Sequence, residues 1–310
     1  IDMKTVHFKE MEKFRGEVVT GIGKFDGVHL GHRVILKTIL EESEKTGLTP
    51  SVFTFRKFPA DFMLCGWEEK LSILKEAGIK ICFWCDLNEV MHLSPEKFLN
   101  ILLTAGVKTL IVGYDFHFGA GRKGDINFLQ KRKEEKGFNL IRVPPYRVNG
   151  EVVNASEIRN FIKRGDVIKA ANFLGRYFSV TGKVIKGSNM GRTLGFPTAN
   201  LALENNIRIG EGVYAGWALY DKKIYQAAIV IGVSPTFEKT FENGRNKFEV
   251  FILGFSGKDI YGEKLRVFLF KKIRNQEKFQ DKEKLKVQIE NDIKKITTLL
   301  RGRLKIELTI

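Results

Sequence analysis

Cysteine is scarce in this sequence of 310 residues, which contains three in total. So small and odd a number does not support a disulfide framework and indicates a reducing compartment such as the cytoplasm. No apolar run approaches the roughly 18 residues that a membrane-spanning helix needs, so we expect no membrane span. The first residues show no basic segment followed by an apolar one, so we expect no secretory leader.

Acidic residues are also the minority among the charges, with 36 Asp and Glu against 52 Lys and Arg, a formal net charge of +16. A surplus of this size favours polyanionic partners, either nucleic acid or the phosphates of nucleotides, and net charge does not choose between them. Hydrophobic residues at 43% and charged residues at 28% exclude a disordered or collagen-like chain. The length predicts two domains.

The first half alternates short apolar runs with segments of helical periodicity. This pattern predicts a parallel sheet with helices on both faces, a Rossmann-like arrangement in which ligands bind beyond the carboxyl ends of the strands. The expected strands are 17–22, 50–55, 79–84, 107–112 and 138–143, and the expected helices are 29–46, 68–77, 94–103 and 125–136.

The pattern changes near residue 176, after two short expected helices at 156–164 and 166–174. Short apolar runs broken by turn residues then predict an antiparallel sandwich or barrel. These runs are 178–185, 213–220, 223–233, 247–253 and 264–270. A last helix is expected over 281–300, because its apolar residues recur on one helical face.

A glycine-rich segment from Gly23 to His32 joins the first expected strand to the first helix. A helix N-terminus attracts anions, and His29 and His32, three residues apart, can reach the same phosphate. The pattern therefore predicts triphosphate binding and stabilisation of charge on phosphorus. The alternative is that the two histidines are ordinary surface or core side chains.

A second glycine-rich segment, residues 187–201, resembles a P-loop, but its glycines are one residue too close and Arg192 stands at the lysine position. We therefore reject a Walker site and expect a flap over phosphates. Thr198 and Asn200, two residues apart on an extended chain, face the same way. Their hard oxygens suit Mg²⁺, and the alternative is a simple turn with a structural asparagine.

Two further features have plain structural interpretations. Cys82 and Cys85 have the spacing of a redox or zinc pair, but in a strand they point to opposite faces, so we expect core packing. Glu249 stands alone among apolar residues of an expected strand, where an isolated carboxylate usually faces solvent.

Residues 25–32 resemble the N-terminal half of the bacterial bifunctional riboflavin kinase/FAD synthetase family, which activates ATP for adenylyl transfer. Segments 113–119 and 156–159 also resemble that family, and the second has the composition of a phosphate clamp with Ser156 as a hydroxyl N-cap. The resemblance implies catalytic roles for His29 and His32, and nucleotide or flavin contacts for Gly23, Phe25, Asp26, Gly27, Gly31, Gly113, Asp115, Phe118, Gly119, Ser156 and Arg159.

Residues 191–200 match the Gly-Arg-x-Leu-Gly-Phe-Pro-Thr-Ala-Asn pattern of riboflavin kinases, and segments 212–214, 231–237, 248–255, 259–262 and 273–279 match further family patterns in order. The resemblance implies that Glu249 takes the proton of the ribityl hydroxyl and that Thr198 and Asn200 hold the metal. It also implies nucleotide or flavin contacts for Gly187, Gly191, Arg192, Gly195, Phe196, Pro197, Tyr214 and Arg274.

The expected fold is therefore a Rossmann-like nucleotidyltransferase domain over 1–176, followed by an antiparallel β-barrel kinase domain with a C-terminal helix over 177–310. The resemblance implies phosphorylation of riboflavin to FMN and adenylylation of FMN to FAD with release of pyrophosphate. Mg²⁺ with ATP is the expected cofactor. ATP, ADP, riboflavin, FMN and FAD are the expected partners, with no nucleic acid and no membrane.

The first half departs from the family pattern at four positions. Asn154 and Ala155 replace two serines, Phe58 stands where histidine is common, and His117 stands where arginine is common. One alternative is therefore a riboflavin kinase whose adenylyltransferase domain is degraded. A second alternative, from another class of protein, is a basic regulator that binds nucleic acid or flavin with an inactive enzyme fold.

Overall fold

The computed structural model describes residues 2–187, 190–203, 207–233, 246–257, 259–277, 279 and 281–303. Contacts between Cα atoms divide these residues into two compact units. The first unit holds 1–61 and 67–154, and the second holds 62–66 and the chain from Ala155 onward. Helices α5 (Ala155–Arg164) and α6 (Val167–Leu174) belong to the second unit, where they pack on each other and α6 contacts two strands of the barrel. The domain boundary between residues 176 and 177 stays a prediction.

A six-stranded parallel sheet forms the centre of the first unit, as the alternating pattern predicts. The strands lie in the order β1 (Lys4–His7), β4 (Ile81–Cys85), β3 (Thr49–Phe55), β2 (Val18–Ile22), β5 (Val107–Gly113) and β6 (Asn139–Val143). The sequence pattern missed β1, because a four-residue edge strand with one fully buried side chain has little periodicity to detect.

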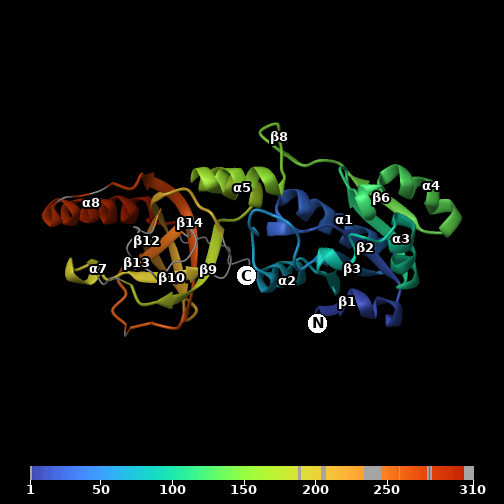
Figure 1. The fold of residues 1–310 in the computed structure, drawn as a ribbon, viewed down its shortest axis with the longest axis horizontal. Helices are drawn as coiled ribbons and strands as arrows, with labels where there is room; N and C mark the ends of the chain where they lie inside the picture. The colour runs from blue at the N-terminus through green and yellow to red at the C-terminus, as the bar shows by residue number, and fades with distance from the viewer. Residues whose placement is uncertain are drawn as a thin grey trace. The chain divides into compact units, whose positions relative to one another are not determined.

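Helices cover both faces of this sheet (Figure 1). Helices α1 (Leu30–Thr46) and α2 (Trp67–Glu76) bury their apolar residues in one core cluster. The short helix η1 (Phe8–Lys13), α3 (Pro95–Thr104) and α4 (Ile126–Lys136) contribute to the other. Cys82 lies in the first cluster and Cys85 in the second, so the prediction of core packing on opposite faces is confirmed. The three cysteines are free and buried.

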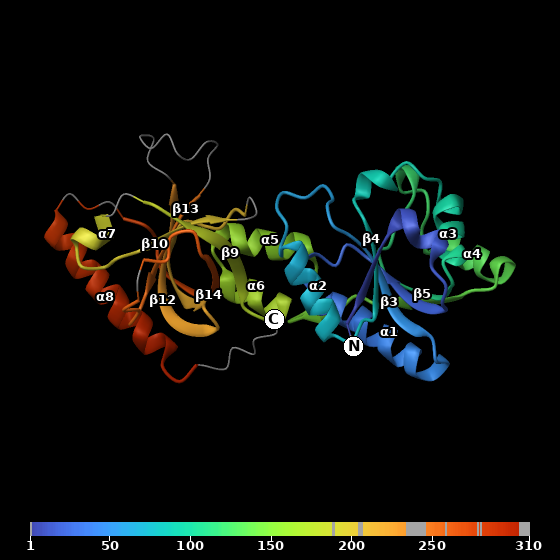
Figure 2. The same cartoon turned by 90° about the horizontal axis from the view of Figure 1, so that it is seen from below.

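The second unit is built on a closed antiparallel barrel, which resolves the choice between sandwich and barrel. Its strands, in spatial order, are β10 (Ala199–Leu203), β13 (Asn246–Ile252), β12 (Lys223–Val233), β11 (Gly212–Tyr220), β14 (Lys264–Arg274) and β9 (Phe178–Ile185). The C-terminal helix α8 (Lys282–Leu300) packs along β11 and β12, with Ile296 and Leu300 buried in the shared cluster (Figure 2).

The shorter elements include a hairpin and a single-turn helix. The hairpin of β7 (Arg147–Val148) and β8 (Glu151–Val152) precedes α5, and the single-turn helix α7 (Met190–Thr193) lies within the glycine-rich segment. No helix among the described residues is both long and apolar enough to cross a membrane.

Candidate functional sites

The segment after β2 has an unusual backbone. Phe25 and Val28 have φ of 45° and 38°, in the left-handed region that disfavours residues with side chains, and Gly27 between them has φ of 67°. Both non-glycine residues are fully buried. Each left-handed residue costs about 1–3 kcal/mol, and such strain clusters at ligand sites. The strained segment, which includes the short helix η2 (Asp26–Val28), lies directly after the carboxyl end of β2. Asp26 within it is also buried.

His29 and His32 stack on each other, with ring centroids 3.6 Å apart and planes inclined by 19°. His29, the first residue of the predicted helix, is the N-cap of α1, and its Nδ1 accepts a hydrogen bond from the backbone N–H of His32 at 3.3 Å. Gly31 leaves room for this stack, because a Cβ there would lie only 3.2 Å from the His29 Nδ1. The sequence prediction that the two rings share one side of the helix start fits this geometry.

Burial lowers the pKa of His32 well below its usual range, and the nearby charges of His29 and Lys70 lower it further. The imidazole of His32 is therefore neutral at physiological pH. Its Nδ1 is buried and has no hydrogen-bond partner among the described residues. A buried ring nitrogen without a partner at a helix N-terminus suits a ligand that supplies the missing hydrogen bond.

The second predicted segment of the first unit begins where β5 ends. Gly113 closes β5, the neighbour of β2, so it lies at the same carboxyl edge as Gly23. Asp115 is exposed, and its carbonyl oxygen lies 2.9 Å from the His117 Nδ1. Phe118 stacks on Phe116 and packs against the core, so its ring also has a structural role. Gly119 follows it with φ of 72°.

The third predicted segment opens α5. This helix begins at Ala155, so Ser156 is its second residue, and the prediction that Ser156 is the N-cap is wrong. Asn154 precedes the helix and donates from its side chain to the Val152 carbonyl at 3.2 Å. Arg159 Nε donates to the Phe62 carbonyl at 2.8 Å. Both Ser156 and Arg159 belong to the second unit, and their contact with a nucleotide in the first stays a prediction.

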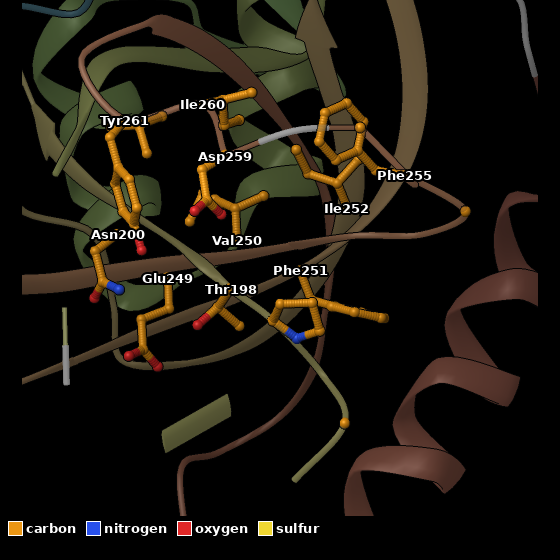
Figure 3. Close-up of a pocket in the computed structure, with 16 residues that line it drawn as sticks. Thr198, Asn200, Glu249, Val250, Phe251, Ile252, Phe255, Asp259, Ile260 and Tyr261 are labelled. Carbon is orange, nitrogen blue, oxygen red and sulfur yellow. The ribbon is translucent and has the colours of Figure 1, made fainter. Parts of the chain in front are cut away.

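Thr198, Asn200 and Glu249 line one cavity of about 320 Å³ at the barrel (Figure 3). Asn200 on β10 is paired directly with Glu249 on β13, so their side chains are neighbours. Thr198, two residues before Asn200, directs its hydroxyl into the same cavity. The structure thus brings together the three residues that the sequence assigns to the metal and the base. The other lining residues are Val184, Gly195, Pro197, Ala199, Val250, Phe251, Ile252, Gly254, Phe255, Gly257, Asp259, Ile260 and Tyr261.

Gly187 and Gly191 of the glycine-rich segment lie close to Asn200 and Thr198. A Cβ at Gly187 would collide with the side-chain amide of Asn200. A Cβ at Gly191 would collide with the Phe196 carbonyl and come within 3.2 Å of the Thr198 hydroxyl. Both glycines are therefore required by close approach, which fits a segment that folds over a polar cavity. Residues 188–189 and the side chain of Arg192 lie outside the described part of the chain, as do residues 234–237 of one family segment.

An ion pair at the cavity was missed in the sequence. Lys247 Nζ lies 2.9 Å from the Glu249 Oε1, and the two side chains are 20% and 23% exposed. Residues two apart on a strand share a face, so a lysine at 247 was the available signal. The ion pair gives the Glu249 carboxylate a fixed partner at the edge of the cavity.

Tyr214 and Arg274, two predicted ligand contacts, have structural partners. Tyr214 is fully buried and donates its hydroxyl hydrogen bond to the Gly210 carbonyl, and burial raises its pKa. Arg274 forms an ion pair with Asp292 of α8, in which Nε donates to Oδ1 at 3.1 Å and Nη2 donates to Oδ2 at 2.7 Å. Asp292 is 6% exposed and was not singled out in the sequence, since its partner lies 18 residues away in another element. Ligand contact by Tyr214 and Arg274 stays a prediction.

The first unit is a parallel α/β fold with a histidine pair at a helix N-terminus. The second is a barrel with a polar cavity. Together the two units indicate a transferase that uses nucleotides. Family models agree with each half: the FAD synthetase model matches residues 11–157 and the riboflavin kinase model matches residues 174–300. The chain belongs to the family of bifunctional riboflavin kinase/FMN adenylyltransferases.

Relatives of that name match along nearly the whole length. The protein from Buchnera aphidicola subsp. Schizaphis graminum is 33% identical over 91% of this chain and 94% of its own, and that from Escherichia coli K12 is 34% identical over 94% and 95%. A solved structure from Streptococcus pneumoniae, named a macrolide-efflux protein, superposes with a TM-score of 0.83 at 27% identity over 94% of this chain and 97% of its own. The last comparison supports the fold of each of the two units.

Proposed function

We propose that the chain makes FMN and FAD in two steps, one in each half. The C-terminal half transfers the γ-phosphoryl group of ATP to riboflavin, and the N-terminal half transfers AMP from ATP to FMN. The observation that carries the kinase step is the single cavity that collects Thr198, Asn200 and Glu249. The stacked His29 and His32 at the start of α1 carry the adenylyl step.

In the kinase step, Glu249 accepts the proton of the ribityl hydroxyl as that oxygen attacks the γ-phosphorus. The bond from the γ-phosphorus to the bridging oxygen breaks and ADP leaves. The glycine-rich segment over Thr198 and Asn200 holds the phosphates close to the base. Asn200 and Thr198 offer two neutral oxygens, a donor set that fits Mg²⁺, which would neutralise charge on the phosphates when bound.

In the adenylyl step, a phosphate oxygen of FMN attacks the α-phosphorus of ATP and pyrophosphate leaves. The N-terminus of α1 and the two histidines face the charge that develops on phosphorus. His32 is neutral, so its ring acts as a hydrogen-bond partner rather than as a fixed cation. The departures at Asn154, Ala155 and His117 leave this pair intact, so we favour both activities over the kinase-only alternative.

We also place the enzyme in the cytoplasm, with ATP, ADP and the three flavins as its small-molecule partners. The three free cysteines support this proposal, because a reducing compartment keeps thiols unpaired. Burial also raises the pKa of Cys82 and Cys85 to about 12, so these two thiols are unreactive. The basic charge is assigned to nucleotide phosphates rather than to nucleic acid, because the polar cavity and the histidine pair are sites for small phosphorylated ligands.

The deciding experiment is product analysis after the full chain is incubated with riboflavin and Mg-ATP. We expect FMN first and then FAD, and neither product when the metal is removed with EDTA. FMN without FAD, even after hours with added FMN and excess Mg-ATP, selects the kinase-only alternative. No product, together with strongly salt-dependent binding to DNA or RNA, selects the regulator.

A further inference from the structure

Lys247, which has no part in the proposed reaction, lies beside the proposed base of the kinase step. Its Nζ is 2.9 Å from the Glu249 Oε1, and the two side chains are 20% and 23% exposed. Ion pairs between fully exposed side chains contribute little, because water and salt screen them and both side chains keep many rotamers. This pair is mostly covered by protein, so its partners are held more firmly than those of an ordinary surface pair.

The neighbouring strands explain why the pair is covered. Lys247 and Glu249 are two residues apart on β13, so their side chains point to the same face of the barrel. On that face Glu249 is paired with Asn200 of β10, and Figure 3 shows these two side chains next to each other. Lys247 is paired with Gly232 of β12, where a Cβ would collide with the side-chain amide of Gln276. Gln276 therefore lies on the face from which the Lys247 side chain projects and leaves it less room than an open strand would.

The ion pair is compatible with the work of a base. A carboxylate has two oxygens, so Oε1 can hold the lysine while Oε2 accepts the proton of the ribityl hydroxyl. A glutamate without such a partner would have to be fixed in the right orientation during each reaction. A base that is already oriented toward the hydroxyl avoids this loss of freedom and reacts faster.

We propose that Lys247 is a positioning residue for riboflavin phosphorylation, which orients the Glu249 carboxylate toward the ribityl hydroxyl through the ion pair at Oε1. This inference rests on the proposed role of Glu249 as the base. Two other roles would give different kinetics. A lysine that only stabilised the barrel would leave kcat unchanged when replaced, and a lysine that bound the phosphates of ATP would chiefly set KM for the nucleotide.

The test uses the full chain with Lys247→Met, which keeps most of the apolar side chain and removes its charge and donors. Lys223→Met is the control, because Lys223 is an exposed lysine at the start of the neighbouring strand β12. We expect kcat for riboflavin phosphorylation to fall about 10²-fold, as misplacement of a reacting group by about 1 Å does. KM for riboflavin and for Mg-ATP, FMN adenylylation in the same sample and both activities of the control should stay at wild-type values. Lys247→Arg should recover most of the rate, because a guanidinium also donates to a carboxylate.

A double-mutant cycle shows whether Lys247 acts through Glu249. Lys247→Met should slow the wild-type chain but should not slow Glu249→Gln any further, because orientation no longer matters once the base is removed. A wild-type kcat in Lys247→Met overturns the proposal. An equal fall of kcat in both backgrounds, a raised KM for Mg-ATP with unchanged kcat, or a failure of Lys247→Arg to recover any rate also overturns it.

Failure of the proposed base gives a different result. Glu249→Gln at the wild-type rate overturns the base itself, and the role of Lys247 falls with it. A slow Glu249→Gln beside a normal Lys247→Met rejects the role of Lys247 alone. If Lys247→Met unfolds at a lower urea concentration and makes no FMN, Lys247→Thr decides instead, because threonine favours strands and carries no charge. A folded Lys247→Thr with a low kcat supports the proposal, and one with a wild-type kcat overturns it.

Discussion

At the scale of single residues, the kinase cavity depends on the alternation of side chains along two paired strands. Asn200 faces the cavity from β10, and its partner Glu249 faces it from β13. Lys247 shares that face and pairs with the carboxylate. A shift of either strand by one residue would turn that strand's side chains to the opposite face. The register of β10 against β13 therefore assembles the proposed base beside the proposed metal ligands.

We predict that Glu249→Gln lowers the turnover of riboflavin phosphorylation by about 10²–10⁴-fold, the usual contribution of a positioned base. The amide keeps the shape of the side chain but cannot accept the proton of the attacking hydroxyl. Adenylylation of supplied FMN should be unchanged. Steady-state assays of both reactions, with the exposed Glu263→Gln as control, check this, and an unaltered rate of FMN production rejects Glu249 as the base.

At the scale of elements, the Arg274–Asp292 ion pair binds helix α8 to the barrel in addition to the apolar face of the helix. The Arg274 side chain is 19% exposed and that of Asp292 9%, so most of this ion pair is removed from water. Gln288 donates a further hydrogen bond to Asp292 at 2.9 Å. Removal of one member of a buried pair leaves the other charge unpaired, which costs more than the pair itself contributes.

We predict that Asp292→Ala lowers the free energy of unfolding of the barrel unit by about 3 kcal/mol. The exposed Glu290→Ala on the same helix should change it by less than about 0.5 kcal/mol. Urea denaturation followed by tryptophan fluorescence, with Trp217 buried in the cluster between the barrel and α8, measures both. Equal midpoints for the two variants would show that the apolar face alone holds α8.

Most helices and strands could be predicted from the local sequence pattern, and those that could not have a physical reason. The strands and helices of the first half appear within one or two residues of their predicted bounds, because buried parallel strands are continuous apolar runs. Gly47 ends α1 in the left-handed conformation with φ of 74°, as a helix-ending glycine should. The single-turn α7, the edge strand β1, the barrel strand β10 and the β7–β8 hairpin were missed, since each of these elements is too short to show a period.

At the scale of the whole molecule, the His29–His32 pair and the kinase cavity lie in different compact units, so the two activities should be separable by mutation. We predict that His32→Ala lowers FAD formation by at least about 10²-fold, because a partner of the developing phosphate charge is lost. FMN should then accumulate from riboflavin at the normal rate.

Chromatography of the flavin products checks this prediction, with the exposed His92→Ala as the control. A normal yield of FAD from His32→Ala would falsify the role of this histidine. A parallel loss of FMN would instead show that the two halves do not act independently.

The sequence by itself determined the order of the elements, the two glycine-rich segments and the residue types at both sites, because these are local properties of the chain. Only the tertiary structure decided which distant residues meet. Closure of the barrel placed Glu249 against Asn200, and the packing of α2 brought Lys70 to the ends of β2 and β3. It also paired Arg274 with Asp292. Such contacts depend on register and packing between elements, which no local pattern of residues encodes.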